Sequence, residues 1–154
     1  MRRFAILGLV LTATVRVLLL EGTPTLFAQP TGAASLPAAV RKAFEQSYPG
    51  AAISTATQTR DGNQTVFRVD STDKGRRRVV LYDGSGKVVE VSEQIAEKDL
   101  PKPVADAMHS HPRAIYGSGW RVTRGGSVEY RLTVRGTRKT AMVAKPDGTV
   151  VSFN

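Results

Sequence analysis

The clearest chemical signal in the chain is a set of charged side chains that alternate with apolar ones. Glu129, Arg131, Thr133 and Arg135 take every second position of a segment whose other positions are Val, Tyr, Leu and Val. A period of two is typical of a half-buried β-strand, so these polar side chains share one face of a sheet. Arg68 holds the position equivalent to Arg131 in the first half of the chain. We expect these five residues to form a protein-binding face, unless they serve only as cross-strand ion pairs.

A second group of basic residues opens a strand in each half of the chain. Arg76, Arg77 and Arg78 form one run, and the matching segment of the second half contains Arg138 and Lys139. Charges of this kind either keep an exposed sheet edge soluble or form a basic rim that attracts an acidic partner. The sequence leaves both interpretations open.

The aromatic and histidine residues point to binding rather than catalysis. Trp120 is the only tryptophan and follows a Gly-Ser-Gly run, so it is either a core residue or an aromatic anchor for a protein partner. His109 and His111 would face different ways on a helix, and there is no third histidine, so no metal site is expected. The chain lacks cysteine, nucleophile motifs and phosphate loops. We therefore expect no cofactor and no catalytic residue.

The composition is that of a basic protein that folds without covalent cross-links. The 154 residues carry a formal net charge of +9, and 41% are hydrophobic and 23% charged. These proportions are ordinary for a globular domain and unlike those of a disordered chain. We expect the partner to be an envelope or secreted protein, and the positive charge keeps binding of anionic envelope polymers or lipid head groups as the alternative. Nucleic acid is disfavoured, because only 6% of residues are aromatic and no recognised module is present.

The N-terminal segment has the order of a secretory signal. Two arginines follow Met1, an apolar stretch comes next, and Ala28 offers a cleavage site. We expect residues 1–28 to be removed, residues 29–34 to form a flexible lead-in, and the mature protein to be periplasmic or secreted. An uncleaved membrane anchor is the alternative, but Arg16 within it would cost about 2.5–3.5 kcal/mol on insertion.

The remainder of the chain carries a similar pattern twice. A Leu-Pro start at residues 36 and 100, an aromatic-Arg-aliphatic strand centre at 67 and 130, and a Gly-x-Val-Val turn at 86 and 148 recur in the same order. We interpret this as a duplication within a single domain, with repeats at 35–98 and 99–154, each a helix followed by four strands. The strands are predicted over residues 52–60, 64–71, 77–83 and 87–95, and over 114–124, 127–135, 138–145 and 149–153.

Short turns between the strands predict an antiparallel sheet with both helices packed on its apolar face, an α+β fold. Ser35 is a suitable N-cap for the first helix, and Pro37 and Pro103 are compatible with a first helical turn. Phe67 and Tyr130 are expected at equivalent buried positions. The opposite face of the sheet is expected to be polar and solvated.

These motifs resemble those of the PepSY-like family, also called beta-lactamase-inhibitor-like. The resemblance rests on the Leu-Pro helix starts, on Tyr48–Ala51 (Tyr-Pro-Gly-Ala) and on Tyr82–Val89 (Tyr-Asp-Gly-Ser-Gly-Lys-Val-Val). It covers nearly all of residues 35–154, although His109–Pro112 stands where Tyr-Pro would recur and Phe67 where a Tyr is usual. The resemblance implies an exported bacterial protein with tandem helix-and-strand units that binds or inhibits other proteins. It brings no catalytic residues.

Overall fold

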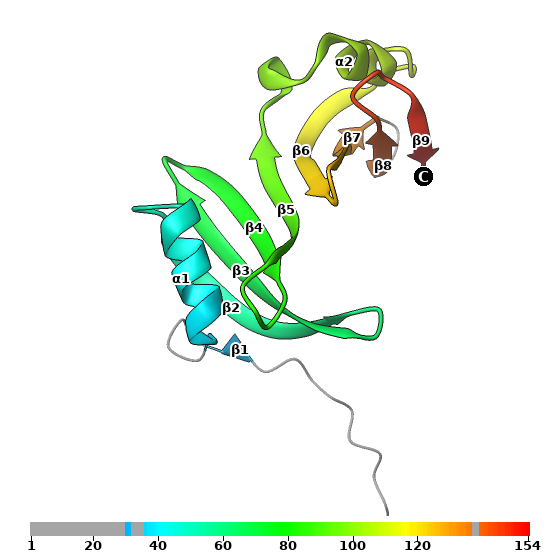
Figure 1. Cartoon of the computed structure of the whole chain (residues 1–154). Helices are drawn as coiled ribbons and strands as arrows, with labels where there is room; N and C mark the ends of the chain where they lie inside the picture. Colours follow the sequence, from blue (N-terminus) through cyan, green and yellow to red (C-terminus); the bar gives the residue numbers. More distant parts are fainter. Residues whose placement is uncertain (1–29, 32–35, 137–138) are drawn as a thin grey trace, which may run out of the picture.

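The computed structural model describes residues 30–31, 36–136 and 139–154. Within these ranges the chain forms two α-helices and a nine-stranded sheet in which each strand pairs antiparallel with the next one in sequence (Figure 1). The predicted α+β class with an antiparallel sheet is confirmed. None of the described helices is long and apolar enough to span a membrane. The predicted signal at 1–28, the N-cap Ser35 and the basic Arg138 lie outside the described residues.

Apart from β1, the elements follow the predicted order of one helix before four strands in each half. The first half contains β1 (Pro30–Thr31), α1 (Ala38–Ser47), β2 (Ala52–Asp61), β3 (Gln64–Asp73), β4 (Arg76–Tyr82) and β5 (Val88–Ile95). The second half contains a short 3-10 helix, η2 (Glu97–Asp99), then α2 (Lys102–His109), β6 (Ile115–Arg124), β7 (Ser127–Arg135), β8 (Lys139–Ala144) and β9 (Val150–Phe153). The hairpin turns set this order, because each strand returns beside the one before it.

Each helix follows a proline and buries one face. A proline immediately precedes both helices, where its missing N–H removes no intrahelical hydrogen bond. Pro103 also lies in the first turn of α2, as predicted. Val40 and Phe44 are four residues apart in α1 and both buried, and Val104 and Met108 repeat this spacing in α2. The spacing places each pair on the helix face that meets the sheet.

Strand β1 falls within the segment predicted as a flexible lead-in over residues 29–34, of which only residues 30–31 are described. Pro30 and Thr31 pair with Thr57 and Ala56 of β2. The outer side of β2 would otherwise present unpaired backbone groups, and an added strand satisfies them. A proline is compatible with this position because an edge strand needs no donor on its outer side.

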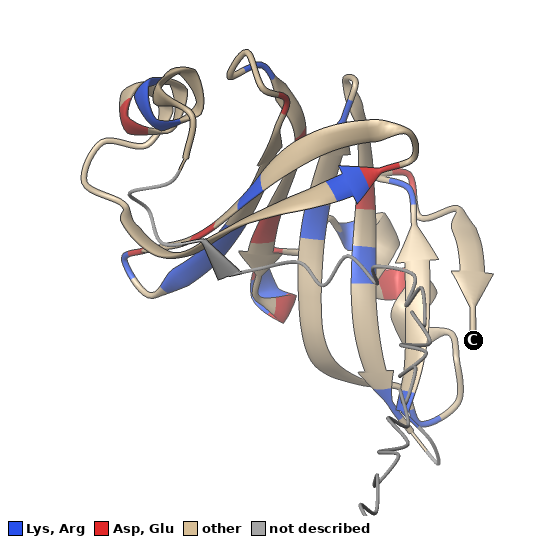
Figure 2. Cartoon of the chain, turned by 90° about the horizontal axis from the view of Figure 1, so that it is seen from below, with Lys and Arg blue, Asp and Glu red and all other residues tan. Residues whose placement is uncertain are grey.

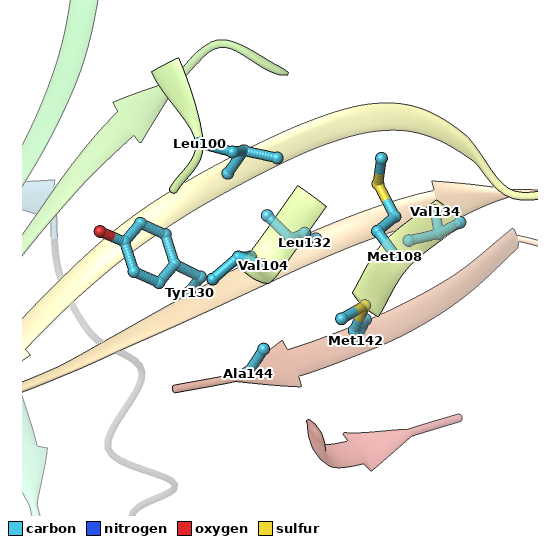
Figure 3. Close-up of a cluster of buried hydrophobic side chains, with 8 residues drawn as sticks. All are labelled: Leu100, Val104, Met108, Tyr130, Leu132, Val134, Met142 and Ala144. Carbon is cyan, nitrogen blue, oxygen red and sulfur yellow. The ribbon is translucent and has the colours of Figure 1, made fainter. Parts of the chain in front are cut away.

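Two hydrophobic cores lie beneath the two helices. The first joins α1 to strands of the first half through Leu36, Val40, Phe44, Ala56, Val69, Val80 and Tyr82. The second joins α2 to strands of the second half through Leu100, Val104, Met108, Tyr130, Leu132, Val134, Met142 and Ala144 (Figure 3). Among the described residues no core member is shared. The hydrophobic burial is therefore divided between the halves, and the sheet connects them.

Both helices pack on the same face of the sheet. In β5, Val91 packs against the first core and Ile95 against the second, and residues four apart on a strand point the same way. The face continues into β4 and β6 through the neighbours Val80 and Gly119. Figure 1 shows α1 against the strands of the first half and α2 against those of the second. This agrees with the predicted packing of both helices on one face.

One turn in each half packs closely against a helix. Gly86, between β4 and β5, has φ +86°, and a Cβ there would lie 2.7 Å from the carbonyl oxygen of Ala39. Gly148, between β8 and β9, has φ +87°, and its Cβ would lie 2.6 Å from the carbonyl oxygen of Pro103. Ala39 and Pro103 are each the second residue of their helix. Only glycine fits both the left-handed backbone and the close approach.

The equivalence predicted for Phe67 and Tyr130 holds only in part. Tyr130 is buried in the second core, whereas Phe67 is half-buried at the border of the first. The Phe67 ring lies beside Gly84 in the turn after β4, and a glycine offers no side chain to cover it. The expectation that Phe67 is buried is corrected accordingly.

The helix-free face is not the solvated polar surface that the sequence predicts. Val66, Val79 and Val122 are buried although they belong to neither core, and they alternate with residues that face the helices. Arg124 of β6 reaches Asp61 of β2 at 2.7 Å. A flat sheet would separate β2 and β6 by four spacings, about 19 Å. The sheet therefore curves toward this side, which we call the concave face; its twist is visible in Figure 1.

Candidate binding groove

The concave face contains a groove that crosses five strands. The groove has a volume of ≈ 330 Å³. Its lining residues come from β3 to β7 and are Arg68, Val79, Leu81, Glu90, Ser92, Trp120, Val122 and Arg131. The groove thus contains Arg68, Arg131 and Trp120, which the sequence singled out separately.

Backbone register explains how these side chains are placed. The groove is lined by three rows of cross-strand neighbours, Arg68–Leu81–Glu90, Val79–Ser92–Val122 and Trp120–Arg131. Successive rows are two residues apart along each strand, so all three lie on one face. Arg68 belongs to the first row on β3, and Arg131 to the last row on β7. The two arginines therefore stand at opposite corners, with apolar side chains between them.

Arg68 forms a bidentate ion pair on its own strand. Its Nε donates to Asp70 Oδ2 at 2.7 Å, and its Nη2 donates to Oδ1 at 3.0 Å. Hydrogen bonding to this carboxylate raises the pKa of Arg68 further, so the side chain is charged at any physiological pH. The Arg68 side chain is 45% exposed and that of Asp70 only 17%. The guanidinium projects into the groove region while its counter-charge is recessed.

Trp120 and Arg131 form the other end of the groove, and Arg77 approaches the Trp120 ring from outside the groove lining. Trp120 is half-buried and belongs to neither core, so it is not the core residue that one interpretation of the sequence suggested. The Arg77 guanidinium carbon lies 5.9 Å from the centroid of the Trp120 ring, within cation–π range. Arg131 Nη2 lies 3.6 Å from Glu129 Oε1, beyond hydrogen-bond distance. Arg131 therefore has only a loose ionic partner.

Glu90 anchors the floor of the groove. This buried carboxylate accepts hydrogen bonds from Arg124 Nε at 2.9 Å and from Ser92 Oγ at 3.1 Å. Arg124 also donates through Nη1 to Asp61 at 2.7 Å. Hydrogen bonds to Glu90 and then Asp61 raise the pKa of Arg124. Because Arg124 joins carboxylates of β2 and β5 to β6, this network holds the curvature that forms the groove.

The remaining residues of the predicted face lie on β7 beside the groove. The alternation on β7 is as expected, since Tyr130 and Leu132 are buried while Arg135 is exposed. Glu129 approaches Arg131, but Thr133 and Arg135 do not line the groove. Of the face predicted on β7, Arg131 therefore lines the groove and Glu129 lies beside it, whereas Thr133 and Arg135 lie outside it.

The predicted basic rim is not one continuous surface. The three arginines at the start of β4 and Lys139 at the start of β8 are separated by three strands. Both are interior strands, so protection of a sheet edge does not explain these charges. Arg76 and Arg78 instead pair with Asp99 and Glu93, each at 3.0 Å, beside a separate hollow of ≈ 180 Å³. The Arg76–Asp99 pair connects the two halves, whereas the Arg78–Glu93 pair lies within the first half.

The two histidines have unrelated environments. His109 Nε2 lies 3.1 Å from Glu97 Oε1, whereas the ring of His111 stacks on Phe153 with centroids 3.8 Å apart. No group of three or more His, Asp or Glu side chains placed to hold a metal ion occurs in the described part of the chain. Neither histidine lines the groove.

The sequence analysis missed the apolar floor of the groove. Val79 and Leu81 face the groove, and their neighbours Val80 and Tyr82 face the first core, so β4 is apolar on both faces. An unbroken apolar run is typical of a strand buried on both sides, and that pattern was visible in the sequence. Glu90 gave no comparable signal, because its burial depends on the approach of Arg124.

No protein-family profile and no curated protein matches the sequence. The fold, however, is similar to that of several solved structures. A predicted periplasmic protein from Bacteroides eggerthii DSM 20697 matches with a TM-score of 0.65 at 16% identity, over 77% of this chain and 87% of that one. A DUF2874 family protein from Bacteroides uniformis ATCC 8492 matches with a TM-score of 0.64 at 18% identity, over 77% and 88%.

A third structure connects this fold with the resemblance noted in the sequence. A BLIP-like protein from Bacteroides fragilis NCTC 9343 matches with a TM-score of 0.59 at 17% identity, over 75% of this chain and 83% of that one. At such identity the similarity establishes a shared fold and nothing further. The chain therefore has a BLIP-like fold, as the sequence motifs predicted.

Proposed function

We propose that the protein is an exported, non-enzymatic module that binds another protein through its concave face. The observation that carries this proposal is the groove, which combines an apolar floor with projecting arginines and a tryptophan. Arginine and aromatic residues are enriched at the centres of protein interfaces, where they contribute much of the binding energy. Arg68, Arg131 and Trp120 are the residues of these types in the groove.

The shared fold supports export and a binding role. Its members include a predicted periplasmic protein and a BLIP-like protein. Because one fold serves many functions, the proposal of protein binding rests on the groove, and the shared fold is only consistent with it. We further propose that the chain is a PepSY-like protein whose residues 1–28 are a signal removed near Ala28.

We also propose that the two halves, residues 35–98 and 99–154, are copies of one unit. The matched glycines, Gly86 and Gly148, support this, because each meets the second residue of its own helix in a left-handed conformation. Arg68 and Arg131 are then equivalent residues of the two units. In this proposal the groove arises because curvature brings equivalent positions of two copies to one site.

The alternative function is electrostatic binding of anionic envelope polymers or lipid head groups. The net charge of +9 and the exposed arginines favour it. The two functions differ in their response to salt. Polymer binding weakens steeply as salt rises because counterions are released, as for nucleic acid. A packed protein interface loses association rate more than affinity.

The direct test is affinity capture from the native envelope and medium with the full chain carrying a C-terminal tag. Capture is performed at roughly 50 mM and 500 mM salt, a range that spans strong and weak screening. We expect a defined protein to be retained at both concentrations. Recovery of polysaccharide or lipid that is lost at the higher salt would replace the protein-binding proposal with the polymer alternative.

The captured partner then tests the concave face directly. Charge reversal at both corners of the groove, Arg68→Glu with Arg131→Glu, is expected to weaken binding at least tenfold, and circular dichroism checks that the variant remains folded. The matched control is Lys42→Glu with Lys145→Glu, two exposed lysines that do not line the groove. Equal affinity of the groove variant, the control and the unaltered protein would exclude this face as the interface.

A further inference from the structure

We infer that the groove takes an extended, acidic segment of its protein partner, with two carboxylates that flank an apolar side chain. This inference rests on the proposed function and adds the chemistry of the occupant. It follows from three features of the concave face: the exposure of its charges, the apolar character of its floor, and the separation of its two corner arginines.

The charges of the concave face are paired, yet its positive charges are the more exposed. Asp70 is 17% exposed, against 45% for Arg68 and 63% for Arg77, its two ionic neighbours. Glu90 is 10% exposed and its partner Arg124 is 48% exposed. An approaching partner therefore meets guanidinium groups first, although carboxylates lie behind them. Figure 2 shows that basic and acidic positions lie among one another on the strands of the sheet.

The exposed guanidinium groups retain free donors for a ligand. Each guanidinium carries five N–H groups, and a bidentate pair with a carboxylate uses two of them. Arg68 has such a pair with Asp70, whereas Arg131 approaches Glu129 only to 3.6 Å. Both arginines can therefore donate to a further carboxylate without losing the partner that they already have.

The floor between the corners is mainly apolar and suits an apolar side chain, because its two polar residues, Glu90 and Ser92, are hydrogen-bonded within the protein. Val79 and Val122 are buried beneath the groove, and Leu81 and the half-buried Trp120 are its other apolar lining residues. Uncharged polymers and nucleic acid would need donors or stacking rings along the whole path, and a continuous polyanion would need cations there. The groove instead places cations at its corners and hydrocarbon at its centre. Charge and hydrophobic pattern together match an acidic peptide with a central apolar residue.

The separation of the corner arginines sets the spacing of the two carboxylates. Arg68 lies on β3 and Arg131 on β7, four strand spacings or about 19 Å across the sheet, and their rows are four residues or about 14 Å apart along the strands. On a flat sheet the diagonal between them would be about 23 Å, which an extended peptide covers in about seven residues at about 3.4 Å per residue. Curvature of the sheet shortens the direct path across the groove. Acidic residues four or five positions apart are therefore expected to reach both arginines.

Fluorescence of Trp120 provides the test, because it is the only tryptophan in the chain and lines the groove. The probe is the capped hexapeptide Glu-Ser-Leu-Val-Ser-Glu, titrated into the full-length protein at low salt. Its analogue with both Glu replaced by Gln and its analogue with both replaced by Lys are the peptide controls. We expect a saturable change in Trp120 fluorescence with the Glu peptide and at least tenfold weaker binding of the Gln peptide.

Variants separate this inference from the proposed function. Arg68→Glu with Arg131→Glu is expected to abolish the response to the Glu peptide, and the Lys42→Glu with Lys145→Glu control to retain it. Equal binding of the Glu and Gln peptides, or no binding of either, would overturn the inference that the groove takes an acidic segment. If the same groove variant still loses the captured partner, the proposed protein-binding face survives that result. A response to polygalacturonate stronger than to the Glu peptide also overturns the inference, in favour of a polymer.

Discussion

At the scale of single residues, Tyr82 is unusual because it combines a buried ring with an unpaired hydroxyl. Its ring is completely buried in the first core, yet its hydroxyl has no hydrogen-bond partner among the described residues. Burial raises the pKa of Tyr82 to about 12, with a smaller effect from Tyr48 and an opposing one from Arg78. Replacement of a buried, unpaired polar group by an apolar one of the same shape is nearly neutral or stabilising. Tyr82→Phe is therefore expected to be at least as stable as the unaltered protein at pH 7.

The same residue predicts a dependence of stability on alkaline pH. The pKa of Tyr82 is higher in the folded protein than the ordinary value of about 10, so the unfolded chain loses this proton first. The free energy of unfolding is therefore unaffected by this group below pH 10. It falls by up to about 1.4 kcal/mol per pH unit as pH rises from 10 through 12. Urea unfolding of Tyr82→Phe between pH 10 and 12 should show a shallower loss of unfolding free energy. Parallel curves for the two proteins would contradict this account of Tyr82.

At the scale of elements, the turns between β4 and β5 and between β8 and β9 determine how each helix meets the sheet. An alanine Cβ at Gly86 would lie 2.7 Å from a helix carbonyl and would also force a left-handed backbone. Gly62 provides a matched control, because it has φ +59° and no atom within 4 Å of the same Cβ position. Both substitutions carry the backbone cost of roughly 1–2 kcal/mol, but only Gly86 adds a steric clash.

Gly86→Ala is accordingly expected to lower the unfolding free energy by about 1–3 kcal/mol more than Gly62→Ala, and Gly148→Ala to behave like Gly86→Ala. Equilibrium unfolding in urea measures all three. If Gly86→Ala and Gly62→Ala had the same effect, the close approach of this turn to α1 would be wrong. A large effect at Gly86 and none at Gly148 would show that the two halves differ at this contact.

At the scale of the whole molecule, two separate cores share one continuous sheet. Phe44→Ala is expected to lower the free energy of unfolding by about 3–5 kcal/mol and Met108→Ala by about 2–5 kcal/mol, because each leaves a cavity in one core. Since no described core residue is shared, the loss of protection should be unequal between the halves. Native-state hydrogen exchange should show Phe44→Ala weakening β3 and β4 more than β7 and β8, and Met108→Ala the reverse. Equal losses in both halves would indicate a single cooperative unit coupled through β5 and β6.

Most of the secondary structure was predictable from the sequence. The alternation on β7 and the four-residue spacing of Val40 and Phe44 reflect local geometry, in which neighbours along the chain decide which side a residue faces. Turn residues between the strands specified hairpins, and hairpins specify the order of strands. The positions of Arg68 and Arg131 on one face followed from the same alternation. All of these properties depend on residues that are close in sequence.

The groove was decided only by the tertiary structure. Sheet curvature depends on contacts between distant strands, such as the ion pair of Arg124 with Asp61 across β2 and β6. That curvature buries Glu90 and Val122 on a face that the alternation of residues alone predicts to be solvated. Trp120, for which the sequence left a core position open, lines the groove. Sequence periodicity states which face a side chain points to, because the period is local. It does not state what lies opposite that face, because the opposing residues are brought there by the path of the whole sheet.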